Sequence, residues 1–507
     1  MTKDYVTYSR ENGGRVMLLF LLFLLSLYSL INSGINGMAM YLALPISVLF
    51  VYLAFSYRMF TFWSLFIINF FLMFLAKERL WPGGIPASLP NEMLELVLIA
   101  IAIIDLRDSN FENLANFMLV AILGWCAFCI IEIFNDTCGL GINVGAWFTG
   151  IRLMAFQLLY AVIVFGLYIN SPERLYKLLY FWAFCLLFAV FWCWKQQHIG
   201  WTEGEKAWLF SAGHARQHIV NGIIRYFSVF TDAANFGIHM AAASCVFYII
   251  AITNKVRKHK LFFGIVGLLC TWAMFASGTR TAIFCMIAGF LIFLVLSKSA
   301  RIIIPVSIVF GLFIGMLIFT DIGQGNNQIR RMRSAFNPED ASANVRDINK
   351  QSIAKYMKDA PWGIGIGIFE QDIPAWNKFK LVAGIPPDSE YVFIWVRTGW
   401  IGVTWFALCN ALILFSACYI VFFKIRNRSL MGIGAAWCAA FTAIHLGGYA
   451  NQILMQFPNI VIFYGGIATV FSLPNIEQQF CEYEARELAD EAERKSLKLE
   501  KKLAKRV

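Results

Sequence analysis

Long apolar runs, each separated from the next by a few polar residues, dominate the pattern along this 507-residue chain. A helix needs about 20 apolar residues to cross the hydrocarbon core of a bilayer. The pattern predicts about fourteen transmembrane helices, at residues 16–33, 38–55, 59–76, 92–106, 115–134, 152–170, 178–194, 236–253, 261–277, 281–297, 302–320, 393–423, 431–449 and 457–473. The first run follows basic residues and lacks a small-residue cleavage site, so we expect it to be a retained helix.

Basic residues fall in alternate short loops, and this alternation sets the expected orientation. Short cytoplasmic loops are enriched in Lys and Arg. With the N-terminus cytoplasmic and fourteen crossings, the basic loops at 255–260, 298–301 and 424–428 all lie inside. The same parity predicts that both termini are cytoplasmic and that two longer segments, about 195–235 and 321–390, lie outside.

Composition supports an all-α polytopic integral membrane protein with one large, partly helical outer loop. Hydrophobic residues make up 59% of the chain and charged residues only 14%, against about 25% charged in a typical soluble domain. So little polar surface excludes a water-soluble particle. The twelve cysteines lie mostly inside apolar runs and show no zinc spacing, so we expect no metal site.

Three regions follow from this organisation. Residues 1–235 hold N-terminal transmembrane helices and the outer segment at 195–235. Residues 236–473 form a core that includes the large outer loop at 321–390. Residues 474–507 form a charged tail, acidic first and basic last, which we expect to be a solvated cytoplasmic helix near membrane lipids.

Two arginines at the outer ends of predicted spans are candidates for anion binding. Arg225 lies just before the span at 236–253, and Arg280 lies in the short turn between the spans at 261–277 and 281–297. An arginine at a membrane rim often only extends its side chain to lipid headgroups. The turn at Arg280 is too short for it to move far from the helix ends. A guanidinium there suits bidentate binding of phosphate, aided by a helix N-terminus.

The large outer loop contains a predicted helix and a glycine-rich turn. Residues 343–360 are expected to be helical, with Val345, Ile348, Ile353 and Met357 on one face and Pro361 at the end. Gly363, Gly365 and Gly367 then alternate along the chain. They neither follow a strand nor open a helix, so a dinucleotide fingerprint is a weak interpretation. A close approach of the backbone to another backbone or to a ligand fits better.

Two carboxylates mark the point where the outer loop enters the span at 393–423. Asp388 and Glu390 face a basic loop, so either can serve as a general base near bound phosphate. The alternative is structural: Asp388 and Ser389 cap the helix, and Glu390 lies in its first turn. The two interpretations are compatible.

Other polar residues have simpler expected roles. His214 and His218 have metal-ligand spacing but lack the glutamate of a zinc protease motif, so we expect solvated histidines. His445 is expected to be a packed histidine or to face a cavity. Glu132 lies near the outer end of its span, where an intramembrane carboxylate is a functional candidate by default.

Four local features together resemble the bacterial O-antigen ligase and O-antigen polymerase family. They are the segment 227–237, the turn Ser277-Gly-Thr-Arg280-Thr-Ala, Arg346 followed by residues 359–367, and Asp388-Ser389 followed after nine residues by Gly399-Trp-Ile-Gly402. Their order and membrane placement match the family over roughly residues 220–405. The family's usual pattern has histidine where this chain has Asp388. A carboxylate can abstract the same proton, and Glu390 is a second candidate.

The resemblance implies a reaction on the periplasmic face of the bacterial inner membrane. The donor is a glycan linked to undecaprenyl pyrophosphate, and the acceptor is a glycan or the lipid A core. Arg225, Arg280 and Arg346 would hold the pyrophosphate leaving group. Asp388 would deprotonate the acceptor hydroxyl, which attacks with inversion. Neither a metal, a cofactor nor a nucleic-acid partner is implied.

Three other functions remain open from the residues alone. A polysaccharide or lipid-linked glycan transporter would suit the span count, although no inverted repeat of the kind found in transporters is evident. Within the same family, a protein side chain can replace the sugar acceptor, as in a protein O-oligosaccharyltransferase. The third alternative is an inactive relative, suggested by Asp388.

Overall fold

The computed structural model describes residues 58–80, 88–105, 111–220, 222–323, 327–333 and 341–504, together with isolated positions elsewhere. Backbone contacts divide the chain into two units, at residues 1–64 and 65–507. The second unit holds nearly all the described residues. The spans predicted at 16–33 and 38–55 fall largely outside the described part of the chain.

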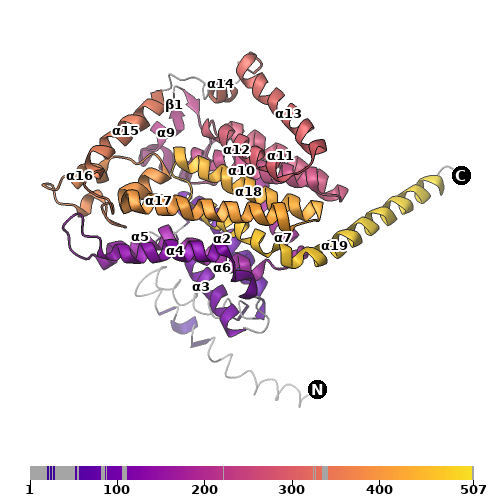
Figure 1. Cartoon of the computed structure of the whole chain (residues 1–507), viewed down its shortest axis with the longest axis horizontal. Coiled ribbons are helices and arrows are strands. Elements are labelled where there is room, and N and C mark those ends of the chain that lie inside the picture. Colours follow the sequence, from indigo (N-terminus) through magenta and orange to yellow (C-terminus); the bar gives the residue numbers. More distant parts are fainter. Residues whose placement is uncertain are drawn as a thin grey trace. The chain divides into compact units, whose positions relative to one another are not determined.

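The regular secondary structure of the described residues is almost entirely helical (Figure 1). The first half contains α2 (Arg58–Lys77), α3 (Leu89–Ile104), α4 (Phe117–Ile131), α5 (Val144–Ile151), α6 (Gln157–Tyr168), α7 (Pro172–His198), α8 (Glu203–Lys206) and α9 (Ala215–His218). A small antiparallel pair, β1 (Ile219–Val220) and β2 (Ile223–Ile224), precedes α10 (Ala233–Thr253). The second half contains α11 (Arg257–Ala276), α12 (Thr281–Leu296), α13 (Ala300–Phe319), α14 (Asn327–Arg333), α15 (Ala341–Met357), α16 (Phe379–Gly384), α17 (Glu390–Tyr419), α18 (Arg428–Ala450) and α19 (Asn459–Ala504).

Every predicted span that falls on described residues coincides with a helix. Within the described part of the chain, nine helices are long and apolar enough to cross a membrane. Two more predicted spans correspond to shorter apolar helices at Thr281–Ser297 and Ile303–Met316. The all-α membrane class is therefore confirmed, and the total of fourteen spans stays a prediction.

The helix at the predicted span 92–106 is short and buries acidic side chains. This helix, α3, has 16 residues and buries two carboxylates. Glu92 forms a bidentate ion pair with Arg152, with N–O distances of 2.7 and 2.8 Å. Glu95 accepts a hydrogen bond from the Gln157 side chain at 2.5 Å. Polar groups buried in this way need partners from neighbouring helices. The π-helical turn Arg152–Phe156 between α5 and α6 supplies Arg152, and the first residue of α6 is Gln157.

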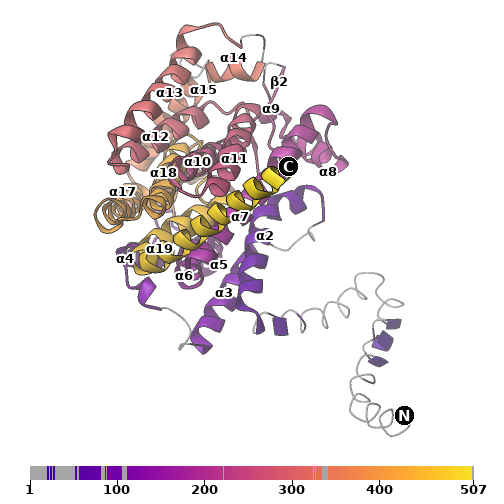
Figure 2. The same ribbon diagram turned by 90° about the vertical axis from the view of Figure 1, so that its right-hand side faces the viewer.

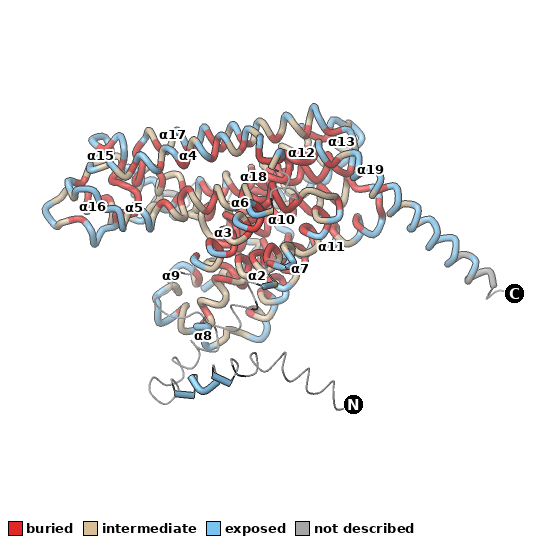
Figure 3. The backbone as a smooth tube through the Cα atoms, turned by 90° about the horizontal axis from the view of Figure 1, so that it is seen from below, coloured by how far each residue is buried: buried red, intermediate tan, exposed pale blue. Residues whose placement is uncertain are grey.

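The core of the second unit is built on α10 and α18. Figure 3 shows buried residues along both helices in the centre of the unit. α10 packs on α11, α12 and α18, and α18 packs on α12 as well. Both helices are rich in glycine and alanine on buried positions. Small residues let helix backbones approach closely when lipid removes the hydrophobic drive for association.

The glycine-rich turn docks on a break in α17. Gly399 has φ 68°, which interrupts the helix and leaves carbonyls before it without helical partners. The N–H groups of Ile364 and Gly365 donate to the carbonyls of Val396 and Arg397, at 2.9 and 3.0 Å. A Cβ on Gly399 would overlap the Pro361 carbonyl. The predicted close approach of backbone to backbone is confirmed.

The segment predicted to be the outer loop has its own small core. The predicted helix at 343–360 is present as α15, at Ala341–Met357. Ile353 and Met357 are buried in a cluster with residues of α16 and the start of α17, as predicted. Ile348 is exposed instead, because the packed face of α15 is narrower than the apolar pattern suggested.

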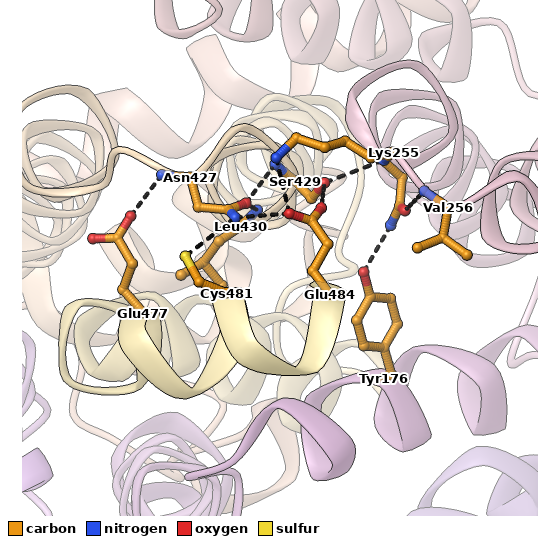
Figure 4. Close-up of polar contacts among 10 residues, drawn as sticks. Tyr176, Lys255, Val256, Asn427, Ser429, Leu430, Glu477, Cys481 and Glu484 are labelled. Carbon is orange, nitrogen blue, oxygen red and sulfur yellow. Dashed lines mark hydrogen bonds and ion pairs between the residues drawn. The ribbon is translucent and has the colours of Figure 1, made fainter. Parts of the chain in front are cut away.

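The acidic half of the charged tail is docked rather than solvated. It continues α19, and Glu484 accepts hydrogen bonds from Lys255 Nζ and Asn427 Nδ2, each at 2.9 Å, and from the Ser429 hydroxyl (Figure 4). Three further acidic residues of α19 contact the same two basic loops: Glu477, Glu487 and Glu491. The prediction of a solvated tail is wrong for this half, since the acidic residues satisfy the loops that follow α10 and α17.

Candidate active site

Segments far apart in the sequence enclose a polar cavity of about 500 Å³ at the N-terminal end of α10. Figures 1 and 2 show α9, α14 and the β-strand pair close together there. Among the residues that the structure describes, four arginines and two carboxylates line the cavity: Arg225, Arg280, Arg331, Arg346, Asp232 and Asp388. We call this space the arginine cavity. It brings together all three predicted pyrophosphate-binding residues and one of the two predicted bases.

Hydrogen bonds to neighbouring residues hold the Arg225 side chain in place. Its Nη1 donates to the carbonyl of Gln217 at 3.0 Å, and its Nη2 donates to the Thr279 hydroxyl at 3.2 Å. Thr279 in turn donates to the carbonyl of Ala233 at 2.7 Å. The Nε of Arg225 is buried and has no hydrogen-bond partner among the described residues. An unsatisfied buried donor of this kind is costly, and a bound anion would satisfy it.

Asp232 and Arg280 occupy the starts of the two helices that border the cavity. The Asp232 carboxylate caps α10 by accepting from the N–H groups of Ala234 and Asn235, at 2.7 and 2.9 Å. The carboxylate therefore stabilises the N-terminal end of α10. Arg280 is the N-cap residue of α12 and lines the cavity together with Thr281, the first residue of that helix.

Arg331 is a site residue that sequence reasoning missed. Its Nε donates to the carbonyl of Gly278 at 2.9 Å, which fixes it beside the turn that carries Arg280. Arg346, from α15, contacts Asn451 Oδ1 at 3.4 Å. The run of basic residues at 330–333 is visible in the sequence. Nothing in that run, however, shows which of its arginines faces the cavity.

Like charges in this cavity perturb one another. Burial, the neighbouring Arg331 and the further positive charges of Arg280 and Arg346 lower the pKa of Arg225 to about 10, against the opposing effect of Asp232. Burial, Arg331 and Arg346 also lower the pKa of Arg280. The guanidinium groups stay charged at neutral pH. Their mutual repulsion would be relieved by a polyanion.

Asp388 lies where the arginine cavity meets a second cavity. This second space, about 350 Å³, is mostly apolar and is lined by the aromatic residues Tyr391, Trp395 and Tyr449. Asp388 and Arg346 line both spaces. The Asp388 carboxylate is exposed, and its Oδ2 accepts a hydrogen bond from Asn349 Nδ2 at 2.9 Å. We call this second space the aromatic cavity.

Glu390, the other predicted base, points elsewhere. It is buried and its Oε2 accepts a hydrogen bond from the N–H of Leu454 at 2.9 Å. It lines a third, separate cavity and is absent from the lining of the arginine cavity. Ser389 is the N-cap residue of α17, but its hydroxyl donates to the carbonyl of Gly448 instead of capping the helix. The predicted cap is wrong, because α18 offers a tertiary acceptor.

His218 is buried, so the prediction of a solvated histidine is wrong for it. Its Nδ1 donates to the carbonyl of His214 at 3.0 Å, and its Nε2 accepts from the N–H of Ala233 at 3.3 Å. The neutral ring therefore satisfies a free N–H at the start of α10. His214 stacks on Trp208, with ring centroids 4.3 Å apart. Sequence spacing alone carried no sign of this tertiary role.

The remaining polar candidates have structural contacts. Glu132 accepts a hydrogen bond from Asn135 Nδ2 at 2.8 Å, and the same amide donates to the carbonyl of Trp362 at 2.7 Å. Glu132 therefore positions the Asn135 side chain for its contact with Trp362. His445 is hydrogen bonded to the Tyr391 hydroxyl at 3.0 Å, as a packed histidine.

Replacing His218 by glutamine is expected to flatten the pH dependence of stability in acid. Burial lowers the pKa of His218 to about 4 in the folded chain, against about 6.5 when unfolded. Between pH 6.5 and 4, His218 becomes protonated in the unfolded chain but stays neutral in the folded chain. The free energy of unfolding therefore falls as pH falls through this range. Above pH 6.5 the group contributes no pH dependence.

Thermal unfolding of the detergent-solubilised protein from pH 7 to 4 measures this effect. The wild-type midpoint should fall more steeply than that of His218→Gln. A matched change at the exposed His198 should keep the wild-type slope. Parallel curves for wild type and His218→Gln would contradict the assignment.

Residues 265–407 match the family model described as O-antigen ligase. The chain carries an O-antigen ligase domain. The matched residues include Arg280, Arg331, Arg346 and Asp388, while Arg225 precedes the match. The resemblance inferred from local motifs is confirmed over this segment. A comparison with curated protein sequences found no match.

The O-antigen ligase domain places the chain in membrane glycan processing for polysaccharide biosynthesis, with a glycosyltransferase-like ligase activity. The family implies a lipid-linked glycan donor and a polysaccharide acceptor. Together with the spanning helices, the domain makes the chain a multi-pass bacterial membrane protein. The predicted division at residues 235 and 473 and the predicted cytoplasmic termini remain predictions.

Proposed function

We propose that this O-antigen ligase-domain protein transfers a glycan from undecaprenyl pyrophosphate to an acceptor sugar hydroxyl at the periplasmic face of the bacterial inner membrane. The observation that carries the proposal is the convergence of four arginines on one cavity. Four arginines against the two carboxylates of Asp232 and Asp388 leave the site an excess of positive charge. A pyrophosphate is the group that such a cluster fits best.

The arginines would stabilise the leaving group. As the bond from the anomeric carbon to the pyrophosphate oxygen breaks, negative charge grows on that oxygen. Preorganised guanidinium groups lower the energy of this charge without reorganising during the reaction. In many phosphate-transferring enzymes Mg²⁺ supplies this positive charge. Four guanidinium groups can supply it here, so we propose a metal-independent reaction.

Asp388 would act as the general base. It stands between the arginine cavity and the aromatic cavity, where an acceptor bound among Tyr391, Trp395 and Tyr449 meets the donor. The acceptor hydroxyl passes its proton to the carboxylate, its oxygen forms the new bond to the anomeric carbon, and the electron pair of the old bond leaves with pyrophosphate. Attack from the side opposite the leaving group inverts the anomeric centre.

Deleting the gene in its host and analysing surface polysaccharide on gels tests the function. Loss of the protein should remove long glycan from the cell surface, and the wild-type gene should restore it. Short chains of single repeats after deletion would identify a polymerase. A bare lipid A core with accumulating lipid-linked polymer would identify a ligase, and loss of glycan from proteins alone would identify a protein O-oligosaccharyltransferase.

Reconstitution in liposomes separates transfer from transport. Purified full-length protein given an undecaprenyl-pyrophosphate-linked glycan and an acceptor should form a new glycosidic bond and release undecaprenyl pyrophosphate. Movement of the lipid-linked glycan across the bilayer without bond formation would overturn the proposal in favour of a transporter or flippase.

A further inference from the structure

The third cavity is enclosed by α5, the glycine-rich turn, the start of α17 and the loop after α18. Its volume is about 250 Å³, and its lining includes Glu390, Phe393, Arg397, Gln452 and Gln456. Gln452 and Gln456 also line the arginine cavity, so the two spaces adjoin. We call this space the Arg397 cavity. The mechanism above does not use Arg397.

Arg397 is a buried cation that forms no ion pair within the described part of the chain. Its side chain is 6% exposed, and its Nη1 has no hydrogen-bond partner among the described residues. The guanidinium carbon lies 4.6 Å from the ring centre of Phe369 and 5.4 Å from that of Phe393. Cation–π contacts of this kind offset only part of the cost of removing a charge from water.

Two carboxylates lie near Arg397: Glu390 lines the same cavity, and the negative charge of Asp372 acts on the guanidinium from a distance. Glu390 accepts a hydrogen bond from the N–H of Leu454, and Asp372 accepts one from the N–H of Phe369 at 2.8 Å. Within the described part of the chain, neither carboxylate forms an ion pair with Arg397. The guanidinium therefore retains unused capacity for an anion.

The rest of the lining suits a sugar ring. Phe369, Phe393, Met455 and Leu153 offer apolar surface, and the amides of Gln452 and Gln456 offer hydrogen-bond donors and acceptors for hydroxyl groups. A mostly apolar wall with a few placed polar groups is the usual composition of a small-molecule site. The volume accommodates a small ligand of about one ring.

We propose that the Arg397 cavity binds the carboxylate of an acidic sugar, of the hexuronic acid class, in one of the two glycans that meet at the arginine cavity. Aromatic contacts on the guanidinium leave its edges for ligands, and two parallel N–H groups match a planar carboxylate. A single cation also matches one negative charge, whereas pyrophosphate has the four-arginine cavity beside it. This inference rests on the proposed glycan transfer and adds a substrate class to it.

Binding of monosaccharide probes to full-length protein in nanodiscs tests the site without any transfer reaction. Wild type should bind methyl glucuronide at least about tenfold more tightly than methyl glucoside, which differs only in the carboxylate. Arg397→Gln should weaken uronide binding by about 10- to 100-fold, the effect of losing a charged hydrogen-bonded pair. Arg397→Lys keeps the positive charge but loses the two parallel N–H groups, so it should retain part of the preference for the uronide.

Three controls test whether the uronide binds in the Arg397 cavity and whether a loss of binding reflects the site and not misfolding. Arg280→Ala must keep the uronide preference, because the arginine cavity is separate; loss of preference in this variant would overturn the proposal. Inorganic phosphate that displaces the uronide at lower concentration than free uronate does would also overturn it. If Arg397→Gln does not fold, equal binding of the two glycosides by wild type still refutes the site.

Transfer kinetics then identify which glycan carries the acid. With a donor glycan whose carboxyl groups have been reduced to alcohols, wild type should show a higher KM for donor if the donor is the acidic one. A carboxyl-reduced acceptor gives the corresponding result for the acceptor. If neither reduction changes KM while Arg280→Ala abolishes transfer, the uronate site is wrong and the proposed function stands.

Discussion

Replacing Arg280 by alanine is expected to lower glycan transfer by about a hundred- to a thousand-fold, the loss that follows removal of one preorganised charge donor. Arg280 lines the arginine cavity at the start of α12, beside Arg331 and Arg225. Without Arg280, less positive charge faces the pyrophosphate in the transition state, when negative charge develops on the leaving oxygen. The rate of product formation by purified protein at saturating donor measures the effect.

Arginines outside the cavity provide a matched control. Arg331 lines the cavity, whereas its chain neighbour Arg330 is exposed and is absent from the lining. Arg331→Ala should therefore slow transfer, and Arg330→Ala should leave it near the wild-type rate. Arg280→Lys keeps a charge but not the bidentate geometry, so an intermediate rate is expected. Full transfer by Arg280→Ala at normal membrane levels would show that the cavity does not hold the leaving group.

Replacing Asp388 by asparagine is expected to lower transfer by about a hundred-fold or more, within the range for loss of a general base. Asparagine keeps the size of the side chain and its contact with Asn349, so folding should be preserved. Membrane levels and thermal stability close to wild type are therefore part of the expected result. A single-turnover measurement with donor and acceptor bound reports the chemical step directly.

Glu390→Gln separates the two carboxylates that the sequence left as alternatives. Glu390 is buried and accepts a backbone N–H of the loop after α18, so its replacement should mainly reduce stability. Asp388→His, which restores the residue usual in the family, should retain measurable transfer. If Asp388→Asn transfers normally and the folded part of Glu390→Gln does not, the assignment of the base is reversed.

Much of the architecture was predictable because one physical rule governs it. A span of about 20 apolar residues has few alternatives to a helix in lipid, so each predicted span that falls on described residues coincides with a helix. One of these helices, α3, contains the buried carboxylates Glu92 and Glu95, whose partners Arg152 and Gln157 lie about sixty residues away along the chain. Apolar pattern alone does not reveal such pairings.

The site was predictable in part. Arg225, Arg280, Arg346 and Asp388 lie around one cavity, as the order of motifs implied. Arg331 was missed because the chain shows several arginines in a row and only packing selects one. Local turn chemistry also failed at Ser389, whose hydroxyl bonds to α18.

By itself, the sequence determined that the chain is helical, membrane-spanning and similar to O-antigen ligases, because apolar length and local motifs are properties of neighbouring residues. Only the tertiary structure decided which charges share a space. It separated Asp388 from Glu390, two residues apart, because the first precedes α17 and stays exposed at the arginine cavity while the second turns into the helix and is buried against the loop after α18. It also buried Arg397 without an ion pair among the described residues. No local pattern could show this, since burial and pairing depend on residues that are distant along the chain.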